Sequence, residues 1–320
     1  MTYWAGRRVL VTGARGFIAS HLCRHLIDDE AVVCGVSTKA IKGQEGMTWR
    51  QIDLTDRVAV RELVAEVRPE VIFHLAGHVT GSQSIEQVAP TLDQNLISTI
   101  NILTASVETV RSRVLLAGSM QEPNPKDSAS VLPSPYAASK WACNAYARMF
   151  HGLYQLPVSI ARPFMVYGPG QWDTVKLLPY VITSFLNGQS PRVSSGDRVM
   201  DWVYVDDVVD GFLRVASSEY MDGRTIDLGT GDLVSIREIV DRVRRLLGTS
   251  VEATFGAVPD RPFERPHAAR VDETKQLIGW TASTSLDDGL GHAIGWYRNQ
   301  LVSGAVGRYW SPPRPASPAP

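Results

Sequence analysis

Residues 8–19 read RVLVTGARGFIA, and this stretch decides the fold. The apolar run Val9–Val11 predicts a buried strand, and the residues from Gly16 to Ile27 have the apolar spacing of a helix. The turn between them has the pattern G-x-x-G-x-x-A, formed by Gly13, Gly16 and Ala19. Glycine lets the backbone bend and approach a pyrophosphate, and the helix N-terminus offers N–H groups and a positive dipole. The stretch therefore predicts a strand–turn–helix unit that binds a dinucleotide.

The alternation of strand and helix patterns continues through the first half of the chain. Strand-like runs cover 31–36, 71–75 and 114–117, and helix-like runs cover 57–67 and 92–107. Near-continuous apolar strands are typical of a parallel sheet that is buried on both faces. Right-handed crossovers then give a doubly wound fold. We therefore expect a Rossmann-type α/β domain over residues 1–163.

After residue 163 prolines punctuate shorter elements, and two good helical patterns remain, at 235–247 and 286–301. Ser235 and Glu238 have the spacing of a capping box at the start of the first of these. We expect a smaller C-terminal α/β substrate lobe over 164–311, with some exchange of chain between the two domains. The proline-rich tail 312–320 has little to pack against a core, so we expect it to be disordered.

The amino-acid composition bears on which partners the protein binds and in which cellular compartment it works. The chain has 32 basic and 33 acidic residues, and this balance does not favour a nucleic acid or an anionic membrane as a partner. No apolar run approaches the roughly 20 residues needed to span a bilayer. Three cysteines cannot form a disulfide framework, and a strand pattern at 7–11 leaves no room for a signal peptide. We expect a cytoplasmic protein without a metal site.

Two further features bear on the cofactor. Asp53, after the third strand pattern, is a candidate for binding the adenine amino group, and a helix N-cap is an equally good interpretation of it. The segment 33–39 lacks the acid that usually binds the adenosine ribose, whereas Lys39 and Arg15 would suit a 2′-phosphate. The residues therefore leave the choice between NAD and NADP open.

A candidate catalytic pair lies on a later helix pattern. Tyr136 and Lys140 are four residues apart and so share one helix face. The ammonium favours the phenolate electrostatically, and a phenolate can remove a proton from an alcohol while hydride leaves for a nicotinamide. Ser119 ends the preceding strand pattern and could hydrogen-bond the same oxygen. This set predicts an oxidation–reduction site.

Together these motifs resemble the extended short-chain dehydrogenase/reductase family, in its branch of nucleotide-sugar epimerases and dehydratases. The resemblance covers roughly residues 7–300. It rests on TGARGFIASHL at 12–22, HLAG at 74–77, YAASK at 136–140, RPFMVYGPGQ at 162–171, DWVYVDD at 201–207 and DLGTG at 227–231, with Asn95 and Ser119. It implies NAD as cofactor, a UDP-sugar as substrate, and a homodimer formed through two helices of each subunit.

The resemblance also assigns roles to residues. Tyr136 is the implied base, Lys140 its partner and Ser119 the hydroxyl that orients the substrate. The implied cofactor residues are Gly13, Arg15, Gly16, Phe17, Ile18, Ser37, Asp53, Leu54, Leu75, Ala76, Gly77, Asn95, Tyr136, Lys140 and Pro163. The implied substrate residues are His78, Met120, Gln121, Met165, Lys176, Leu177, Val193, Met200, Arg261 and Glu264. Among these, Arg261 would bind the pyrophosphate and Glu264 the ribose diol.

The chain departs from the family pattern at several of these places. Met165 replaces the usual asparagine and Met200 the usual arginine, while Cys143 and Asn144 replace small or acidic residues. Family 4,6-dehydratases have an Asp-Glu pair directly after the Ser119 position. This chain has Met120-Gln121-Glu122 there, so a carboxylate comes one step later.

The reaction type depends on these departures. A dehydratase needs a base for the C5 proton and an acid for the departing C6 hydroxyl. Glu122 and Cys143 are the candidates, and a simple loop carboxylate is an equally good interpretation of Glu122. Cys143 would take the C5 proton as a thiolate, favoured by the charge of Lys140 on the same helix face. The combination of Met120, Met165, Met200 and Cys143 is similar to UDP-N-acetylglucosamine 5,6-dehydratases of tunicamycin biosynthesis. The alternative functions are a UDP-hexose 4-epimerase and a non-catalytic NAD sensor or scaffold.

Overall fold

The computed structural model describes residues 2–39, 46–123, 131–260, 262–263 and 266–302. Among these described residues, seven parallel strands form the main sheet. The strands are β1 (Arg8–Thr12), β2 (Val32–Ser37), β3 (Met47–Gln51), β4 (Val71–His74), β5 (Arg113–Ala117), β6 (Val158–Pro163) and β9 (Thr225–Leu228). Their order is β3-β2-β1-β4-β5-β6-β9, so the order reverses between β1 and β4. Ligands of such sheets bind at the carboxyl ends of the strands at this reversal. The Rossmann-type α/β fold expected from the sequence is confirmed.

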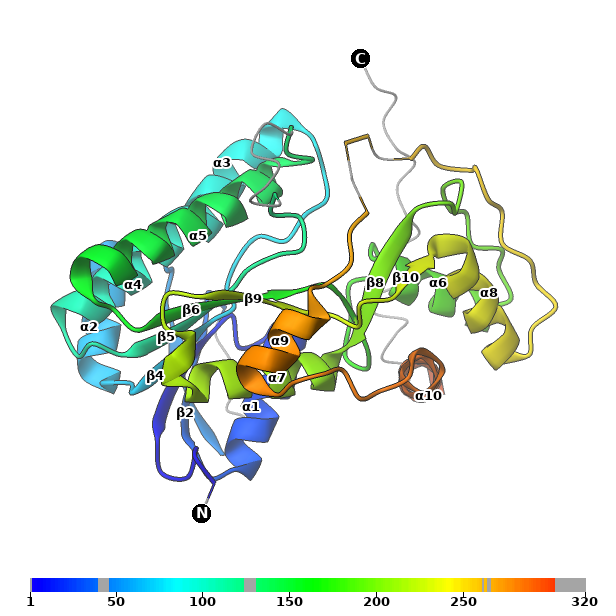
Figure 1. Cartoon of the computed structure of the whole chain (residues 1–320). Coiled ribbons are helices and arrows are strands. Elements are labelled where there is room, and N and C mark those ends of the chain that lie inside the picture. Colours follow the sequence, from blue (N-terminus) through cyan, green and yellow to red (C-terminus); the bar gives the residue numbers. More distant parts are fainter. Residues whose placement is uncertain (1, 40–45, 124–130, 261, 264–265, 303–320) are drawn as a thin grey trace. The chain divides into compact units, whose positions relative to one another are not determined.

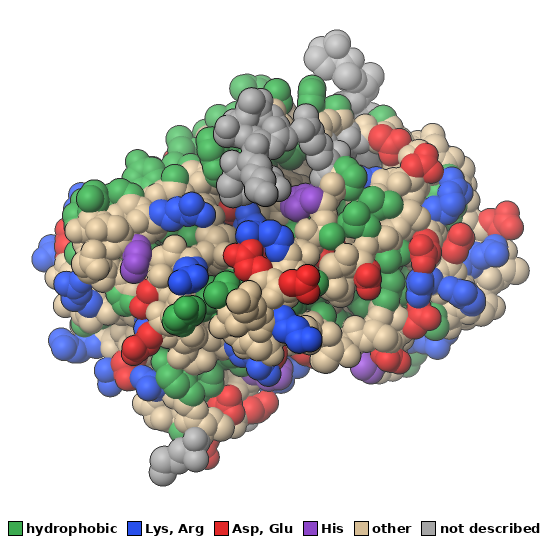
Figure 2. Space-filling model, in the orientation of Figure 1, with side chains coloured by type: hydrophobic (Ala, Val, Ile, Leu, Met, Phe, Trp, Pro, Cys, Tyr) green, Lys and Arg blue, Asp and Glu red, His purple; other side chains and the backbone are tan. Residues whose placement is uncertain are grey.

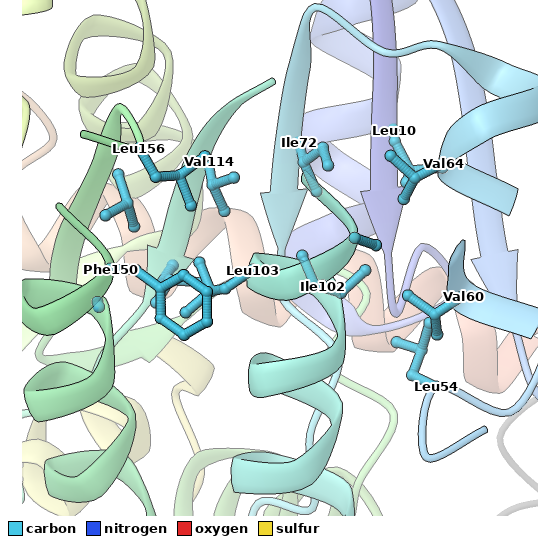
Figure 3. Close-up of a cluster of buried hydrophobic side chains, with 14 of the residues drawn as sticks. Leu10, Leu54, Val60, Val64, Ile72, Ile102, Leu103, Val114, Phe150 and Leu156 are labelled. Carbon is cyan, nitrogen blue, oxygen red and sulfur yellow. The ribbon is translucent and has the colours of Figure 1, made fainter. Parts of the chain in front are cut away.

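Helices cover both faces of this sheet (Figure 1). One face carries α1 (Phe17–Asp28), α7 (Val205–Ser217) and α9 (Val271–Ile278), and the other carries α2 (Arg57–Val67), α4 (Ser98–Glu108) and α5 (Pro135–Tyr154). Figure 3 shows the core on the second side, where Ile102 and Leu103 of α4 and Phe150 of α5 meet Ile72 and Val114 of the sheet. Each such side chain contributes about 1.5–3 kcal/mol when fully buried. This packing fixes α5 against the strands.

The chain divides into two units, and each combines segments that are distant in sequence. Unit 1 consists of Met1–Pro163, Val208–Leu228 and Arg270–Thr281. Unit 2 consists of Phe164–Asp207, Gly229–Ala269 and Ala282–Pro320. The sheet of seven strands belongs to unit 1, so the chain returns to that unit after residue 207 to add β9.

The helix expected over 92–107 is not uniform, and the prediction was wrong in this respect. The chain forms a 3₁₀ turn (η1, Ile85–Gln87), α3 (Val88–Thr91), a π-helical segment (η2, Leu92–Ile97) and then α4. Within η2 the buried side chain of Asn95 reaches the backbone of His78 and the hydroxyl of Ser139. Apolar spacing does not reveal such a π-bulge, a feature that is frequent at functional sites.

The N-cap interpretation of Asp53 was also wrong. Asp56 caps α2, because its Oδ1 accepts hydrogen bonds from the backbone N–H groups of Val58 and Ala59. Asp53 instead accepts from the backbone and hydroxyl of Thr55, which tightens the turn before the helix.

Unit 2 has a small sheet with the order β10-β8-β7. Its strands are β7 (Met165–Tyr167), β8 (Val199–Tyr204) and β10 (Leu233–Ser235), and its helices are α6 (Leu177–Leu186), α8 (Ile236–Leu247) and α10 (Leu286–Val302). Ser235 caps α8 through the N–H of Glu238, as the capping box predicted. Asp201 of β8 is fully buried and accepts from the N–H groups of Thr230, Gly231 and Ala269. One carboxylate thus ties together the loops of this unit.

In the part of the chain that the structure describes, no helix combines the length and the apolar character that a membrane span requires.

Candidate active site

The phosphate-binding turn connects β1 to α1 in unit 1. Gly13 has φ +66°, and a Cβ added there would lie 2.8 Å from the Cα of Ala76, so only glycine fits. Gly16 precedes the first residue of α1 and has no side chain with which to cap the helix, so no side chain of the N-cap competes with a ligand for the first-turn N–H groups. Ala76 donates to the hydroxyl of Thr12, which holds the ends of β4 and β1 together. This cradle fits the pyrophosphate of a dinucleotide.

The other implied cofactor residues of unit 1 come to the same edge of the sheet. The carboxyl ends of the strands are followed by Gly13–Ile18 after β1, Asp53 and Leu54 after β3, and Leu75, Ala76 and Gly77 after β4, while Ser37 ends β2 and Pro163 ends β6. Arg15 is exposed in the turn. Gly77 lies against Asn95, where an added Cβ would come within 2.6 Å of the Asn95 Oδ1. The topology therefore gathers this set around one edge.

A buried histidine connects the cradle with the first turn of α4. The ring of His74 bonds Thr12 Oγ1 at 2.8 Å and Thr99 Oγ1 at 3.1 Å. Because the Thr99 hydroxyl donates to the carbonyl of Asn95, we assign the ring proton to Nε2. Burial, with a smaller contribution from the charge of Lys140, lowers the pKa of His74 to about 3. The ring is therefore neutral and bridges the two segments.

The low pKa of His74 predicts a loss of stability in acid. The unfolded chain binds a proton near pH 6.5 and the folded chain only near pH 3, so the free energy of unfolding falls as the pH drops between these values. The expected loss is about 1.4 kcal/mol per pH unit below 6.5. Urea unfolding at pH 7 and pH 5 measures it, and His74→Asn should show a shallower fall. Equal falls in both proteins would contradict this assignment.

The catalytic set assembles where β5 ends and α5 begins. Ser134 caps α5 by accepting from the N–H of Ala137. Tyr136 and Lys140 follow on one face and are both buried, with the Lys140 Nζ 6.0 Å from the centre of the Tyr136 ring. The same Nζ donates to the carbonyl of Ala117 at 2.8 Å, two residues before the buried Ser119. The hydroxyl, phenol and ammonium predicted from the sequence thus lie on adjoining segments of one unit.

The loop after Ser119 is held by its own polar groups. The N–H of Gln121 donates to the Ser119 hydroxyl, and the side chain of Gln121 accepts from the hydroxyl of Ser134. Met120 between them is half-buried. His78 follows β4, and its ring bonds the side chain of Gln87 at 2.7 Å. These are the implied substrate residues that belong to unit 1.

Glu122 is buried beneath this loop, with only 4% of its surface exposed. One carboxylate oxygen accepts from the N–H of Ser119 at 2.8 Å, and the other accepts from the amide of Asn144 at 3.0 Å. Burial raises the pKa of Glu122, and the nearby Arg162 and Lys140, together with both hydrogen bonds, only partly offset this. Such a carboxyl can hold a proton much nearer neutral pH than an exposed glutamate can.

Cys143 does not have the environment expected of a thiolate base. Its Sγ lies 3.4 Å from the carbonyl of Asn95 and 3.5 Å from the hydroxyl of Thr99, both on the neighbouring π-helical and helical turns. Burial raises the pKa of this thiol, and the opposing effect of Lys140 is smaller. The expectation that Lys140 would ionise Cys143 is therefore not supported, because desolvation outweighs the lysine charge.

The sequence did not single out the charged pairs beneath Glu122. Arg162 donates through Nε and a terminal nitrogen to one oxygen of Asp227, at 2.8 and 2.5 Å, and Arg270 donates to the other oxygen. Arg162 and Asp227 are in register on β6 and β9. Only the pairing of these two strands, which are distant in sequence, reveals the contact.

The remaining implied substrate residues belong to unit 2. Met165 begins β7, and Leu177 begins α6 directly after its N-cap residue Lys176. Val193 is buried, and Met200 is buried in β8 opposite Val234 of β10. Arg261 and Glu264 lie outside the described residues. The roles of all these residues remain predictions.

The chain is similar to both epimerases and dehydratases. It is 29% identical to a UDP-glucose 4-epimerase of Mycolicibacterium smegmatis, over 92% of this chain and 99% of that protein. It is also 29% identical to a probable dTDP-glucose 4,6-dehydratase of Sinorhizobium fredii, over 96% and 95%. A solved epimerase structure from Methanothermobacter thermautotrophicus has the same fold, with a TM-score of 0.85, 23% identity and 95% coverage of both chains.

A family model described as "NAD dependent epimerase/dehydratase family" matches residues 9–229, which include the phosphate cradle, the catalytic set and β9. The cofactor is accordingly NAD, although the segment after β2 lacks the usual ribose-binding acid. By its motifs, its sheet order and this match, the chain belongs to the NAD dependent epimerase/dehydratase family.

Proposed function

We propose that this protein is a nucleotide-sugar dehydratase that converts UDP-N-acetylglucosamine to a 5,6-ene sugar in antibiotic biosynthesis. The observation that carries this proposal is the buried carboxyl of Glu122, which is hydrogen-bonded to the backbone of Ser119. An epimerase needs no such acid beside its serine. The free, buried thiols of Cys23, Cys34 and Cys143 support a reducing, cytoplasmic setting.

The first step is assigned to the set at the start of α5. Tyr136, as phenolate, takes the proton of the sugar C4 hydroxyl, Lys140 stabilises the negative charge, and Ser119 orients the oxygen. Gly13, Gly16 and the first turn of α1 would hold the pyrophosphate of NAD, and the bound nicotinamide would supply the acceptor, and later the donor, of the C4 hydride.

The elimination is assigned to Glu122. The C4 ketone acidifies the C5 proton, which the carboxylate accepts as electrons form the C5–C6 double bond. The resulting carboxylic acid gives a proton to the departing C6 hydroxyl, so water leaves and Glu122 returns to its starting state. The raised pKa of Glu122 supports a group that holds this proton briefly.

A UDP-hexose 4-epimerase is the second candidate, because Ser119, Tyr136 and Lys140 suffice for it and a relative of this activity is equally similar. Mass spectrometry of UDP-N-acetylglucosamine after incubation with the NAD-loaded enzyme separates the candidates. Loss of one water supports the dehydratase, and an isomer of unchanged mass supports the epimerase. An unaltered sugar would leave only a non-catalytic NAD-binding role.

We also propose a homodimer formed through η1, α3, η2 and α5. These neighbouring segments expose Ile85, Val88, Leu92 and Trp141, with Ile85 82% and Trp141 48% exposed. Figure 2 shows hydrophobic side chains along the edge of the molecule over α3 and α5. Apolar surface gathered in this way is typical of a protein interface.

The dimer proposal predicts that Trp141→Glu yields a monomer, because a charge would be buried without a partner in the interface. Sedimentation equilibrium measures the mass directly. Tyr220→Glu, at an exposed aromatic of a different segment, η3 (Glu219–Met221), is the matched control and should sediment as the wild type does. A wild-type monomer, or a Trp141→Glu dimer of equal affinity, would contradict the proposed interface.

A further inference from the structure

The buried carboxyl of Glu122 does not stand alone, because it is the end of a polar network that crosses unit 1. Asn144 of α5 donates to Glu122 at 3.0 Å and to the hydroxyl of Thr225 on β9 at 3.3 Å. Arg162 of β6 lies beside Glu122, and a Cβ added at Gly118 would meet both the Glu122 Oε1 (2.6 Å) and the Arg162 Cγ (2.7 Å). The carboxyl is therefore enclosed from two strands and one helix.

The network brings two different polar side chains together. Position 144 carries a neutral amide, and position 122 carries a carboxyl. The two side chains are hydrogen-bonded to each other. A second carboxylate at position 144 would face Glu122 at hydrogen-bond distance and repel it. The amide instead donates to it.

None of the charged side chains near Glu122 forms an ion pair with it among the described contacts, so its ionisation state is not fixed by a direct partner. Arg162 could neutralise Glu122, but it gives two hydrogen bonds to Asp227, whose side chain is only 2% exposed. The other carboxylate oxygen of Asp227 forms an ion pair with Arg270. On α5, Lys140 contributes a weaker attraction, and Cys143 is held as a thiol.

We propose that Asn144 is a positioning residue that holds the Glu122 carboxyl beneath Ser119, and that Asp227 keeps the nearby Arg162 from pairing with Glu122. This inference deepens the proposed function, since it concerns the carboxyl to which that function assigns the elimination. Asn144 stabilises the ionised carboxylate through its N–H donor, and Asp227 destabilises it by drawing off the arginine charge. The two residues therefore have opposite effects on the titration of Glu122.

The test is the titration of Glu122 itself. It is monitored by ¹³C NMR of the NAD-loaded enzyme, labelled at the side-chain carboxyl of its glutamates. The signal is assigned by its loss in Glu122→Gln. In Asn144→Leu the midpoint should rise by about one pH unit, as expected for the loss of a hydrogen bond to the charged form. In Asp227→Asn it should fall by a similar amount, about one pH unit, because Arg162 then acts on Glu122 alone.

Asn101→Ala is the matched control, because Asn101 is another buried asparagine of unit 1 and donates only to the carbonyls of Leu54 and Thr55. It should leave the Glu122 midpoint unchanged. Asn144→Ala, which also lacks a donor, replaces the leucine variant if that variant does not fold, and the same rise is expected. A midpoint that moves in neither Asn144 variant, or that moves in the same direction in Asp227→Asn, would overturn the inference.

The titration result and the dehydratase activity can be judged separately. If the midpoints move as expected but the wild type releases no dehydrated sugar, the positioning network stands and the dehydratase proposal fails. If the wild type dehydrates the sugar and the midpoints do not move, the dehydratase stands and the network is only structural.

Discussion

Tyr136→Phe should lower turnover by about 10²–10⁴-fold, the range associated with losing a general base. The phenol is the group placed to take the C4 proton, and phenylalanine fills nearly the same buried volume without it. Lys140 would keep its hydrogen bond to the carbonyl of Ala117, so α5 should stay in place. The phosphate cradle is a separate segment, and the NAD content of the purified variant should equal that of the wild type.

The measurements are the rate of sugar conversion and the NAD released on denaturation. Tyr146→Phe is the matched control, because it makes the same chemical change at an exposed position of the same helix. It should retain wild-type turnover. Turnover of Tyr136→Phe within tenfold of the wild type would show that another group removes the proton, and loss of NAD would show that the substitution acts through the cofactor site.

The tight glycine turn and the shared helix face of Tyr136 and Lys140 could be predicted from sequence because each is local. Gly13 and Gly16 belong to one turn between a strand and a helix, and Tyr136 and Lys140 are one helical turn apart, so spacing alone places them. The parallel sheet followed from the same local alternation. The helix bounds of α2, Arg57–Val67, agreed with the apolar pattern residue by residue.

What the sequence could not reveal depends on contacts between distant segments. The link between His74 and Thr99 requires β4 and α4 to lie together, and the Arg162–Asp227 pair requires β6 beside β9. The protonation of Cys143 could not be read from its helix face either. Its spacing from Lys140 suggested a thiolate, but burial against Asn95 decides the direction of its pKa. Desolvation is a property of the packed environment, which spacing does not report.

Glu122→Gln should separate oxidation of the sugar from loss of water. Glutamine keeps the shape and an oxygen to accept from the Ser119 N–H, and Asn144 can turn its own oxygen toward the new amide. Neither step of the elimination can proceed, because an amide neither takes the C5 proton nor protonates the C6 hydroxyl. Release of the 5,6-ene sugar should fall by about 10²-fold or more. The C4 oxidation is assigned to Tyr136, Lys140 and Ser119, so we expect it to continue.

Stopped-flow absorbance of the reduced nicotinamide, together with mass spectrometry of the product, tests this separation. In Glu122→Gln the reduced cofactor should appear on mixing with UDP-N-acetylglucosamine and persist while the dehydrated sugar fails to form. Cys143→Ala should release product at close to the wild-type rate, since its thiol stays protonated. Glu86→Gln, at an exposed glutamate, controls for the loss of a carboxylate. If Glu122→Gln releases the dehydrated sugar as fast as the wild type, another group carries out the elimination. If the wild type interconverts hexose isomers without losing water, the protein is an epimerase. The Glu122 carboxyl then only holds the backbone of Ser119 in place.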